Sequence, residues 1–326
     1  MKSAPLVSVV VPSYNHARFL RERLDSILAQ TFTDFEVIVL DDASTDNSAE
    51  IIGEYANDAR IRYLINEKNS GSVFVQWING VGMAKGKYVW IAESDDVAHP
   101  DFLRELVPKL EQDGTLAIAQ CASIIIDENG KSKGSTIPWT EDLAPGRWAA
   151  DHVNNGNAEC RSYMVVRSTV PNASAVLFRK AMFEEVDKKI PLRLCGDRLF
   201  WSRLLTMGGI SYCAKPFNSF RKHSGSVTHA WKARLYTSES LVVTREIYAR
   251  YAYGGKEQKD LAAKLNTYWG RLVKGGGSLT LIPLTGFLFR LDIGVALKFF
   301  CMHIGDLFGH MAKGPLRSVK RSLSGR

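Results

Sequence analysis

Three short apolar runs, each followed directly by polar or acidic residues, constrain the fold of this chain most strongly. The runs are Val7–Val11, Phe35–Leu40 and Tyr88–Ala92, and the residues that follow them are Pro12-Ser13-Tyr14-Asn15, Asp41-Asp42 and Glu93-Ser94-Asp95-Asp96. Runs of this length predict buried strands, and the apolar residues between them recur at helical spacing. Strands that alternate with helices predict an α/β fold with a mostly parallel, doubly wound (Rossmann-like) sheet.

The rest of the chain is less regular and then becomes helical. Further strands are predicted at Arg60–Ile65, Leu116–Ile126 and Ala173–Phe178, and helices at Leu199–Met207, Trp231–Tyr253 and Lys256–Lys274. The triplet Gly275-Gly276-Gly277 is the clearest linker signal. We therefore expect a sheet-based domain over residues 1–230, a helical extension over 231–274, and a C-terminal segment over 275–326.

The positive charge of the chain is concentrated near its C-terminus. The formal net charge is +8, yet residues 271–326 contain nine Lys and Arg against two Asp. Residues 279–308 are rich in Leu, Ile and Phe, and basic residues follow at Lys313, Arg317, Lys320, Arg321 and Arg326. Two interpretations stay open: a helix packed on the domain with a solvated tail, or an in-plane anchor on an anionic membrane surface. We expect no nucleic-acid partner.

The cysteines and the N-terminus indicate the compartment. Five cysteines are spread over the chain without C-x-x-C spacing, which favours neither a zinc site nor a disulfide framework. The apolar run after Leu6 is too short for a signal peptide, and no stretch reaches the roughly 18 apolar residues of a membrane span. The expected location is the cytoplasm, either free or peripheral on the cytoplasmic face of the plasma membrane.

The acidic cluster at residues 93–96 predicts a metal site. In an open parallel sheet, ligands bind where the strands end, so the polar residues after the three runs should converge. Three carboxylates within four residues repel each other unless a cation lies among them, and hard oxygen ligands favour Mg²⁺ or Mn²⁺. Asp41-Asp42 alone is equally consistent with turn and cap roles. Because the first glycine is Gly53, no glycine-rich phosphate loop follows the first strand, which excludes P-loop and dinucleotide-binding folds.

The motifs together resemble a known family. They are Val7-Ser8-Val9-Val10-Val11-Pro12-Ser13-Tyr14-Asn15, Val39-Leu40-Asp41-Asp42-Ala43-Ser44-Thr45-Asp46, Asn69-Ser70-Gly71-Ser72-Val73-Phe74, and Trp90-Ile91-Ala92-Glu93-Ser94-Asp95-Asp96. The chain is similar over roughly residues 5–230 to family 2 glycosyltransferases of GT-A fold, in the branch that assembles bacterial polysaccharides such as O-antigen and capsule. The resemblance implies a GT-A catalytic domain over residues 1–230.

The resemblance also implies roles for the residues of the first half. Pro12, Tyr14 and Asn15 would border the base and ribose of a nucleotide sugar, and Asp42 would accept a hydrogen bond from the base. Asp95 would be the main metal ligand and would thereby hold the nucleotide sugar. Glu93 stands where the family more often has Asp, and Asp96 lies beside them as a further ligand.

Two motifs of the second half complete the implied site. Asp197 in Gly196-Asp197-Arg198 would be the catalytic base, although the family often has a second acid where this chain has Gly196. Asp197 could instead be the N-cap of the following helix. In Arg221-Lys222-His223, Arg221 would offset phosphate charge and His223 would face the metal or the diphosphate; a structural role for His223 stays open. We interpret His16 as an exposed residue at a helix start.

These inferences predict an inverting, metal-dependent glycosyltransferase. It would use Mn²⁺ or Mg²⁺ and transfer sugar from a UDP-, dTDP- or GDP-linked donor to a glycan or lipid-linked acceptor hydroxyl in surface polysaccharide synthesis. The competing hypothesis is a non-catalytic peripheral membrane or polyanion-binding protein, suggested by the basic C-terminal segment. Binding of sugar nucleotides would discriminate between the two.

Overall fold

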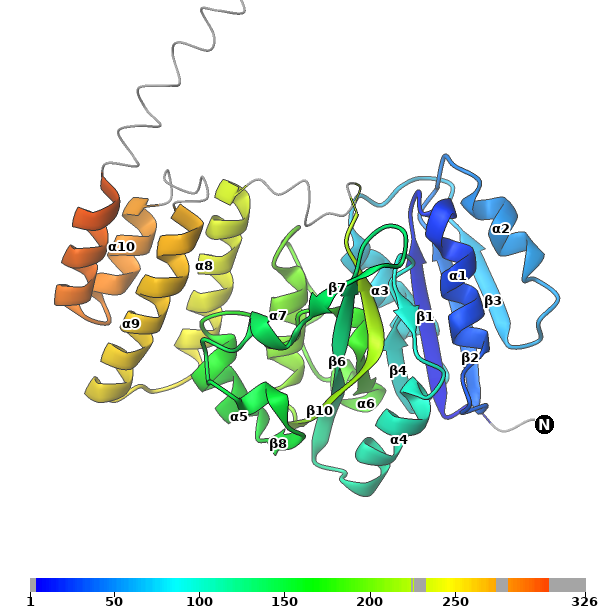
Figure 1. Ribbon diagram of the computed structural model, residues 1–326, viewed down its shortest axis with the longest axis horizontal. Helices are drawn as coiled ribbons and strands as arrows, with labels where there is room; N and C mark the ends of the chain where they lie inside the picture. Colours follow the sequence, from blue (N-terminus) through cyan, green and yellow to red (C-terminus); the bar gives the residue numbers. More distant parts are fainter. Residues whose placement is uncertain (1–3, 224, 226–232, 274–280, 305–326) are drawn as a thin grey trace, which may run out of the picture. The chain divides into compact units, whose positions relative to one another are not determined.

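The computed structural model describes residues 4–223, 225, 233–273 and 281–304, and its core is one large sheet (Figure 1). The main strands lie in the order β3-β2-β1-β4-β9-β6-β10-β5, with β7 paired to β6 and β8 paired to β10. The strands are β1 (Val7–Ser13), β2 (Phe35–Asp41), β3 (Ile61–Ile65), β4 (Tyr88–Ile91), β5 (Val97–Ala98), β6 (Leu116–Ile126), β7 (Ser132–Ser135), β8 (His152–Asn154), β9 (Val176–Arg179) and β10 (Gly209–Arg221).

Helices connect most of these strands. They are α1 (Ala17–Leu28), α2 (Ser48–Glu54), α3 (Val73–Met83), α4 (Phe102–Gln112), α5 (Gly156–Glu159), α6 (Lys180–Glu184), α7 (Gly196–Leu204), α8 (Ala233–Ala249), α9 (Gly255–Leu272) and α10 (Leu281–Phe289), followed by a helix over 293–304. The prediction of an α/β fold with a mostly parallel sheet and C-terminal helices is confirmed.

The strand directions bring the ends of five strands to one edge of the sheet. Strands β1, β2 and β4 are mutually parallel, and β6 is parallel to β10. Strand β9 lies between β4 and β6 and is antiparallel to both, so β6 runs in the same direction as β4. The loops after β1, β2, β4, β6 and β10 therefore meet at one edge, which we call the carboxyl edge.

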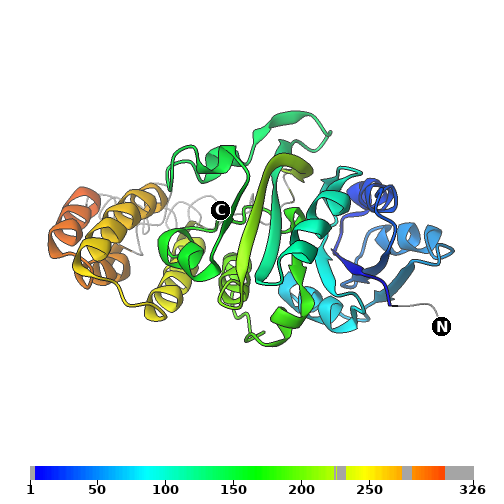
Figure 2. The same ribbon diagram turned by 90° about the horizontal axis from the view of Figure 1, so that it is seen from below.

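Helices cover both faces of the sheet, as a doubly wound fold requires. Val9 and Val11 of β1 share a core with apolar residues of α1 and α4. The opposite face carries α3, where Gly80 packs so closely on Val10 that a Cβ atom there would clash with it. In Figure 2 the blue α1 and the cyan α3 lie on opposite sides of the strands.

The longest strand was not predicted from the sequence. Strand β10 pairs with β6 over its whole length, but its register shifts on both sides of Pro216. Proline cannot donate a hydrogen bond to a neighbouring strand, so it argues against a strand in the sheet interior. Because the pairing is irregular at Pro216, the strand tolerates the missing donor there. Strand β10 then carries its last residue, Arg221, to the carboxyl edge.

Contacts divide the chain into two compact units. One comprises Met1–Cys160 and Ser168–Ser226, and the other comprises Arg161–Arg167 and Val227–Arg326. The predicted domain boundaries at residues 230 and 274 and the basic residues Lys313 to Arg326 lie outside the described residues. Within the described ranges, no helix is both long enough and apolar enough to span a bilayer. The five cysteines, all of them described, form no disulfide.

Candidate active site

The loops after β1 and β2 are joined by side-chain hydrogen bonds at the carboxyl edge. The backbone N–H of Asn15 donates to Ser44 Oγ (2.9 Å), and the backbone N–H of Thr45 donates to Asn15 Oδ1 (2.7 Å). Both loops contain a non-glycine residue in the left-handed region, Asn15 at φ 55° and Ala43 at φ 60°. Such backbone is costly outside glycine and persists where surrounding contacts hold it, which is typical of binding sites. Asn15 therefore fixes the shape of both loops.

Asp42 organises a third loop, over residues 66–76, beside the first two. Its carboxylate accepts hydrogen bonds from Asn66 Nδ2, Gln76 Nε2, and both the backbone N–H and the hydroxyl of Ser70, all at 2.7–3.1 Å. A carboxylate has about four lone-pair sites, and these donors fill them. The predicted hydrogen bond from a nucleotide base would require one of the present donors to move.

Tyr14 and Pro12 occupy different environments in the first loop. The Tyr14 side chain is 46% exposed, whereas Pro12 is buried within β1. An exposed aromatic ring at the carboxyl edge offers a flat apolar face, which suits stacking against a planar heterocycle. Of the two, only Tyr14 presents its side chain to solvent.

The acidic loop after β4 is held from beneath by the segment that leads into β9. The Ser174 hydroxyl accepts from the Glu93 N–H (3.0 Å), and the Ser174 carbonyl accepts from Trp90 Nε1 (2.8 Å). Asn172 Nδ2 donates to Asp96 Oδ2 (2.8 Å). The segment Asn172-Ala173-Ser174 thus positions the acidic loop.

Asp96 and Arg221 support the acidic loop and do not face solvent. Asp96 is 1% exposed, and its Oδ1 accepts from the Arg221 backbone N–H (2.8 Å). The Arg221 guanidinium, also buried, donates to the Asp95 carbonyl through Nε (2.7 Å) and to Glu22 through Nη2 (2.6 Å). These contacts differ from the predicted roles in metal and phosphate binding, because both side chains are already engaged by the protein.

Glu93 is turned towards a tryptophan. Trp77 Nε1 donates to Glu93 Oε1 (2.8 Å). Burial, together with the charges of Asp95 and Asp96, raises the pKa of Glu93 to about 8. Burial and the Asp95 charge likewise raise the pKa of Asp96 to about 6. Burial thus disfavours the charged form of Glu93, and its Oε1 already accepts from Trp77, whereas the pKa of Asp95 is lowered.

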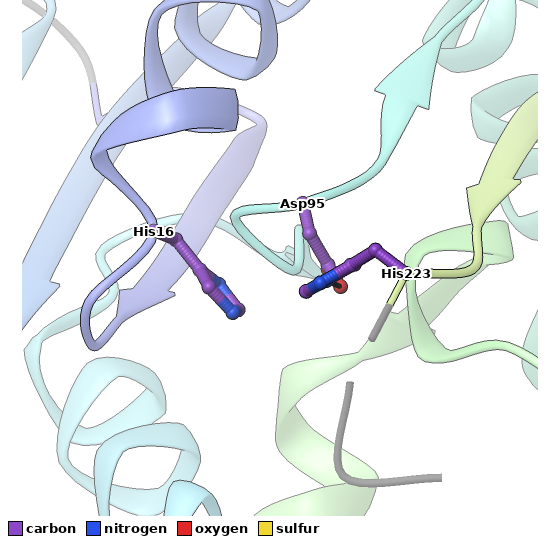
Figure 3. Close-up of side chains that lie close together, drawn as sticks. All are labelled: His16, Asp95 and His223. Carbon is purple, nitrogen blue, oxygen red and sulfur yellow. Dashed lines mark hydrogen bonds and ion pairs between the residues drawn. The ribbon is translucent and has the colours of Figure 1, made fainter. Parts of the chain in front are cut away.

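Asp95 lies against two histidines at the carboxyl edge (Figure 3). Its Oδ2 is 3.1 Å from His223 Nε2, just beyond the end of β10. His16, which follows β1, places its Nδ1 2.7 Å from Ser94 Oγ, and its ring lies edge-on to His223 with centroids 5.6 Å apart. One ligand atom from each of His16, Asp95 and His223 lies within 4.8 Å of the other two.

Burial and neighbouring charges favour the ligating forms of two of these groups, Asp95 and His16. Burial raises the pKa of Asp95, but the hydrogen bond from His223 and the nearby imidazoles outweigh it, so the pKa lies below its ordinary value. Burial lowers the pKa of His16, with the Asp95 charge acting in the opposite sense. A carboxylate and a neutral imidazole are the ligating forms of these side chains. In the described part of the chain, no other His, Cys, Asp and Glu side chains form such a group.

A buried arginine lies close to the acidic loop, and no sequence motif predicted it. Arg23 of α1 is fully buried with its guanidinium 4.9 Å from the Trp90 ring centroid, and none of its nitrogens has a hydrogen-bond partner among the described residues. Burial lowers its pKa to about 10, while Asp96, Asp95 and Glu93 oppose that shift. Arg23 thus offsets part of the charge of the acidic loop.

Asp197 lies in the first turn of α7, on the same face of the sheet as α3. Phe200 and Trp201 of α7 contact Trp77 of α3, with ring centroids 5.4 and 5.9 Å apart. Because Trp77 also donates to Glu93, one aromatic cluster joins the start of α7 to the acidic loop. The alternative of Asp197 as the N-cap is wrong, since Cys195 occupies that position and Asp197 Oδ1 accepts from the Arg198 N–H (2.7 Å).

Gly196 has no room for a side chain. A Cβ atom at this position would clash with the Phe74 ring and with Ile190. Phe74 belongs to the first turn of α3, which begins at the carboxyl edge. The contact therefore sets Asp197 near that edge.

Comparison with known proteins gives consistent matches. The model of glycosyl transferase family 2 matches residues 8–170, half of the chain. An uncharacterized glycosyltransferase of Haemophilus influenzae is 27% identical over 71% of this chain and 70% of its own length. A chondroitin synthase of Pasteurella multocida is 34% identical, but the match spans 42% of this chain and 14% of that enzyme.

Solved structures match over nearly the whole chain. TarS residues 1–349 of Staphylococcus aureus, in complex with UDP-GlcNAc, superposes with a TM-score of 0.69 at 19% identity, covering 92% of this chain and 89% of that one. The mannosyltransferase PcManGT of Pyrobaculum calidifontis, in complex with GDP-Man and Mn²⁺, gives a TM-score of 0.55 at 16% identity, covering 95% and 87%. At these identities the likeness establishes the fold alone.

Proposed function

Because the chain belongs to glycosyltransferase family 2, we propose that it transfers a sugar, with inversion, from a nucleoside-diphosphate donor to an acceptor hydroxyl in polysaccharide synthesis. The observation that carries the proposal is the group of ligating side chains at the carboxyl edge, beside loops suited to a nucleotide. Membership of this family supplies the reaction class, which is sugar transfer, and individual residues would bind the donor, hold the metal ion and act as the base.

The donor would bind across the loops after β1, β2 and β4. The exposed ring of Tyr14 would stack on the base, and Asn15 would keep the first two loops in the shape that receives it. Pro12 and Asp42 would act by fixing the loops that border the base and ribose. The neighbours bind UDP-GlcNAc and GDP-Man, and the donor here would be a UDP-, dTDP- or GDP-linked sugar.

A divalent ion, Mn²⁺ or Mg²⁺, would be held by Asp95 and His223. Their ligand atoms are 3.1 Å apart and lie at the edge where the proposed donor loops meet, so the side chains fit such an ion. Glu93 and Asp96 would contribute through the loop rather than as direct ligands, since their carboxyl groups already bond to Trp77, Asn172 and Arg221. When bound, such an ion stabilises negative charge on the departing diphosphate.

Asp197 would be the general base of a single displacement. It would take the proton of the acceptor hydroxyl as that oxygen forms a bond to the anomeric carbon, while the bond from that carbon to the donor diphosphate breaks. The acceptor and the leaving group lie on opposite faces of the sugar, so the anomeric configuration inverts. The position of Asp197 near the carboxyl edge supports this role.

The first test is binding of sugar nucleotides to the full chain. With Mn²⁺ present at saturation, at least one member of a panel of UDP-, dTDP- and GDP-sugars should raise the melting temperature by several degrees, because a ligand at 100 times its Kd adds about 2.7 kcal/mol of stability. The measurement is thermal unfolding followed by fluorescence. A chain that responds to polyanions such as heparin but to no sugar nucleotide would instead support the polyanion-binding alternative.

We propose further that the second unit holds the enzyme at an anionic membrane, where a lipid-linked acceptor would reside. The helix over 293–304 buries Ala296 and Phe299 but exposes Ile293 (65%) and Leu297 (50%). An exposed apolar stripe beside Lys298 is the arrangement of an in-plane helix, which inserts its apolar face among lipid headgroups.

Replacing both exposed residues, Ile293→Glu with Leu297→Glu, should reduce co-sedimentation with vesicles that contain anionic phospholipid at least about tenfold, because each side chain contributes about 1.5–3 kcal/mol when it leaves water. Val242→Glu on α8, where the side chain is 48% exposed, is the matched control and should leave binding unchanged. Equal sedimentation of both variants and the wild type would favour the packed-helix interpretation.

A further inference from the structure

The direction in which the His16 side chain points is not explained by a role in capping helix α1. It occupies the N-cap position of α1, yet its side chain makes no capping hydrogen bond. Its Nδ1 instead lies 2.7 Å from the hydroxyl of Ser94, next to Asp95 in the acidic loop. Figure 3 shows His16 reaching from the loop after β1 towards the space that Asp95 and His223 face. The ring is thus held across the carboxyl edge, away from the helix that it begins.

We propose that His16 is a third protein ligand of the divalent ion and that this site therefore selects Mn²⁺ over Mg²⁺. The inference rests on the proposed function, in which Asp95 and His223 hold the ion, and it adds one ligand and a preference between the two ions. Its geometric basis is that the ligand atoms of His16, Asp95 and His223 lie within 4.8 Å of one another, as around a single ion.

Ser94 gives His16 the orientation expected of a metal ligand. A ligating histidine usually donates its second ring N–H to an oxygen, which fixes both the ring and the tautomer. With Nδ1–H donating to Ser94 Oγ, the lone pair of Nε2 is left for an ion. Ser94 is 1% exposed, so its hydroxyl is a fixed partner inside the acidic loop. The same loop thus carries one ligand, Asp95, and orients another.

The ligand set determines the metal preference. Mg²⁺ takes oxygen ligands almost exclusively and gives up water reluctantly, whereas imidazole suits first-row transition ions. Two imidazoles and one carboxylate leave coordination positions for oxygens of a diphosphate but supply a single protein oxygen. Mn²⁺ accepts such a mixed set, so the third ligand should strengthen Mn²⁺ binding and contribute little to Mg²⁺ binding.

The test measures metal binding by the full chain with Mn²⁺ or Mg²⁺ alone, and again with UDP present. Calorimetry should give a Kd for Mn²⁺ at least about tenfold below that for Mg²⁺. His16→Ala should weaken Mn²⁺ binding about tenfold or more and change Mg²⁺ binding by less than about threefold. His99→Ala, a half-exposed histidine of the same unit outside the cluster, is the matched control and should change neither.

Pulsed electron paramagnetic resonance of bound Mn²⁺ reads the ligands directly. The wild type should show two coordinated histidine nitrogens, and His16→Ala and His223→Ala should each show one. A single nitrogen in the wild type, or no Mn²⁺ binding with or without UDP, would overturn the inference even if the variants failed to fold. If the wild type binds sugar nucleotides but its spectrum shows one coordinated histidine nitrogen, the proposed function stands and the assignment of His16 fails. If the spectrum shows two coordinated nitrogens but no sugar nucleotide binds, the assignment of His16 stands and the proposed function fails.

Discussion

The Asp197→Asn variant is expected to bind a sugar nucleotide as tightly as the wild type and to transfer sugar about a thousandfold more slowly. The amide keeps the size of the side chain but cannot take a proton from the acceptor hydroxyl, and a positioned general base contributes about 10²–10⁴ in rate. The rate is measured from release of the nucleoside diphosphate in the presence of acceptor, and binding from calorimetry with Mn²⁺. Because the amide matches the carboxylate in size, the packing of α7 and the donor loops should be preserved, and binding should survive.

A purely structural role for Asp197 predicts a different outcome. A carboxylate in the first turn of a helix stabilises it by about 0.3–1 kcal/mol through the helix dipole. If that were its only role, Asp197→Asn would lower the free energy of unfolding by that amount and leave turnover near the wild-type rate. Glu185→Gln, an exposed acid between α6 and α7, is the control for loss of a charge and should alter neither quantity. Retention of the anomeric configuration in the product, observed by NMR, would contradict the single displacement itself.

Asp95→Ala should abolish the metal-dependent part of donor binding. Asp95 is the one acid of its loop whose pKa lies below its ordinary value, and it hydrogen-bonds to His223. Its removal therefore takes away the charged metal ligand and also the hydrogen-bond partner of the second ligand, His223. Loss of groups that only orient metal ligands costs about 10–100-fold in affinity, and loss of a ligand should cost at least the upper end of that range. Calorimetric titration with a sugar nucleotide, with Mn²⁺ and with a chelator, measures the difference.

The control for Asp95→Ala is Asp113→Asn, which removes an acid just before β6, at the opposite edge of the sheet. It should retain the wild-type dependence on Mn²⁺. Wild-type turnover by Asp95→Ala would refute the assignment of Asp95 as the main ligand. Unfolding curves for both variants distinguish a lost ligand from a lost fold.

The sequence predicted which strand ends meet at the edge of the candidate site because the relevant signals are local. Apolar runs that stop at Pro12, at Asp41 and at Glu93 mark both the strands and their ends, and parallel topology then brings those ends together. Strand β10 escaped prediction because Pro216 and its irregular pairing hide the pattern. Helix α4 was also missed, and it contains Pro108.

The direction of each side chain within the site could not be predicted from the sequence. Glu93, Asp95 and Asp96 are nearly adjacent in a turn, yet they face Trp77, His223 and Asn172 respectively. A turn reverses the chain over a few residues, so the surrounding elements, and not spacing, decide where neighbouring side chains point. For the same reason Arg221 lies buried under the loop, while His16, interpreted as an exposed helix start, reaches into the site.

The tight packing at Gly196 also limits how this site can change during evolution. Relatives suggested by the resemblance often have a second acid at this position, but here a new side chain would meet the Phe74 ring. A larger residue at position 196 alone would clash with Phe74, whereas a smaller residue at position 74 alone would leave a void. Because Ile190 also crowds position 196, a larger residue there requires changes at both positions 74 and 190, and a lineage with this packing is expected to keep its single acid.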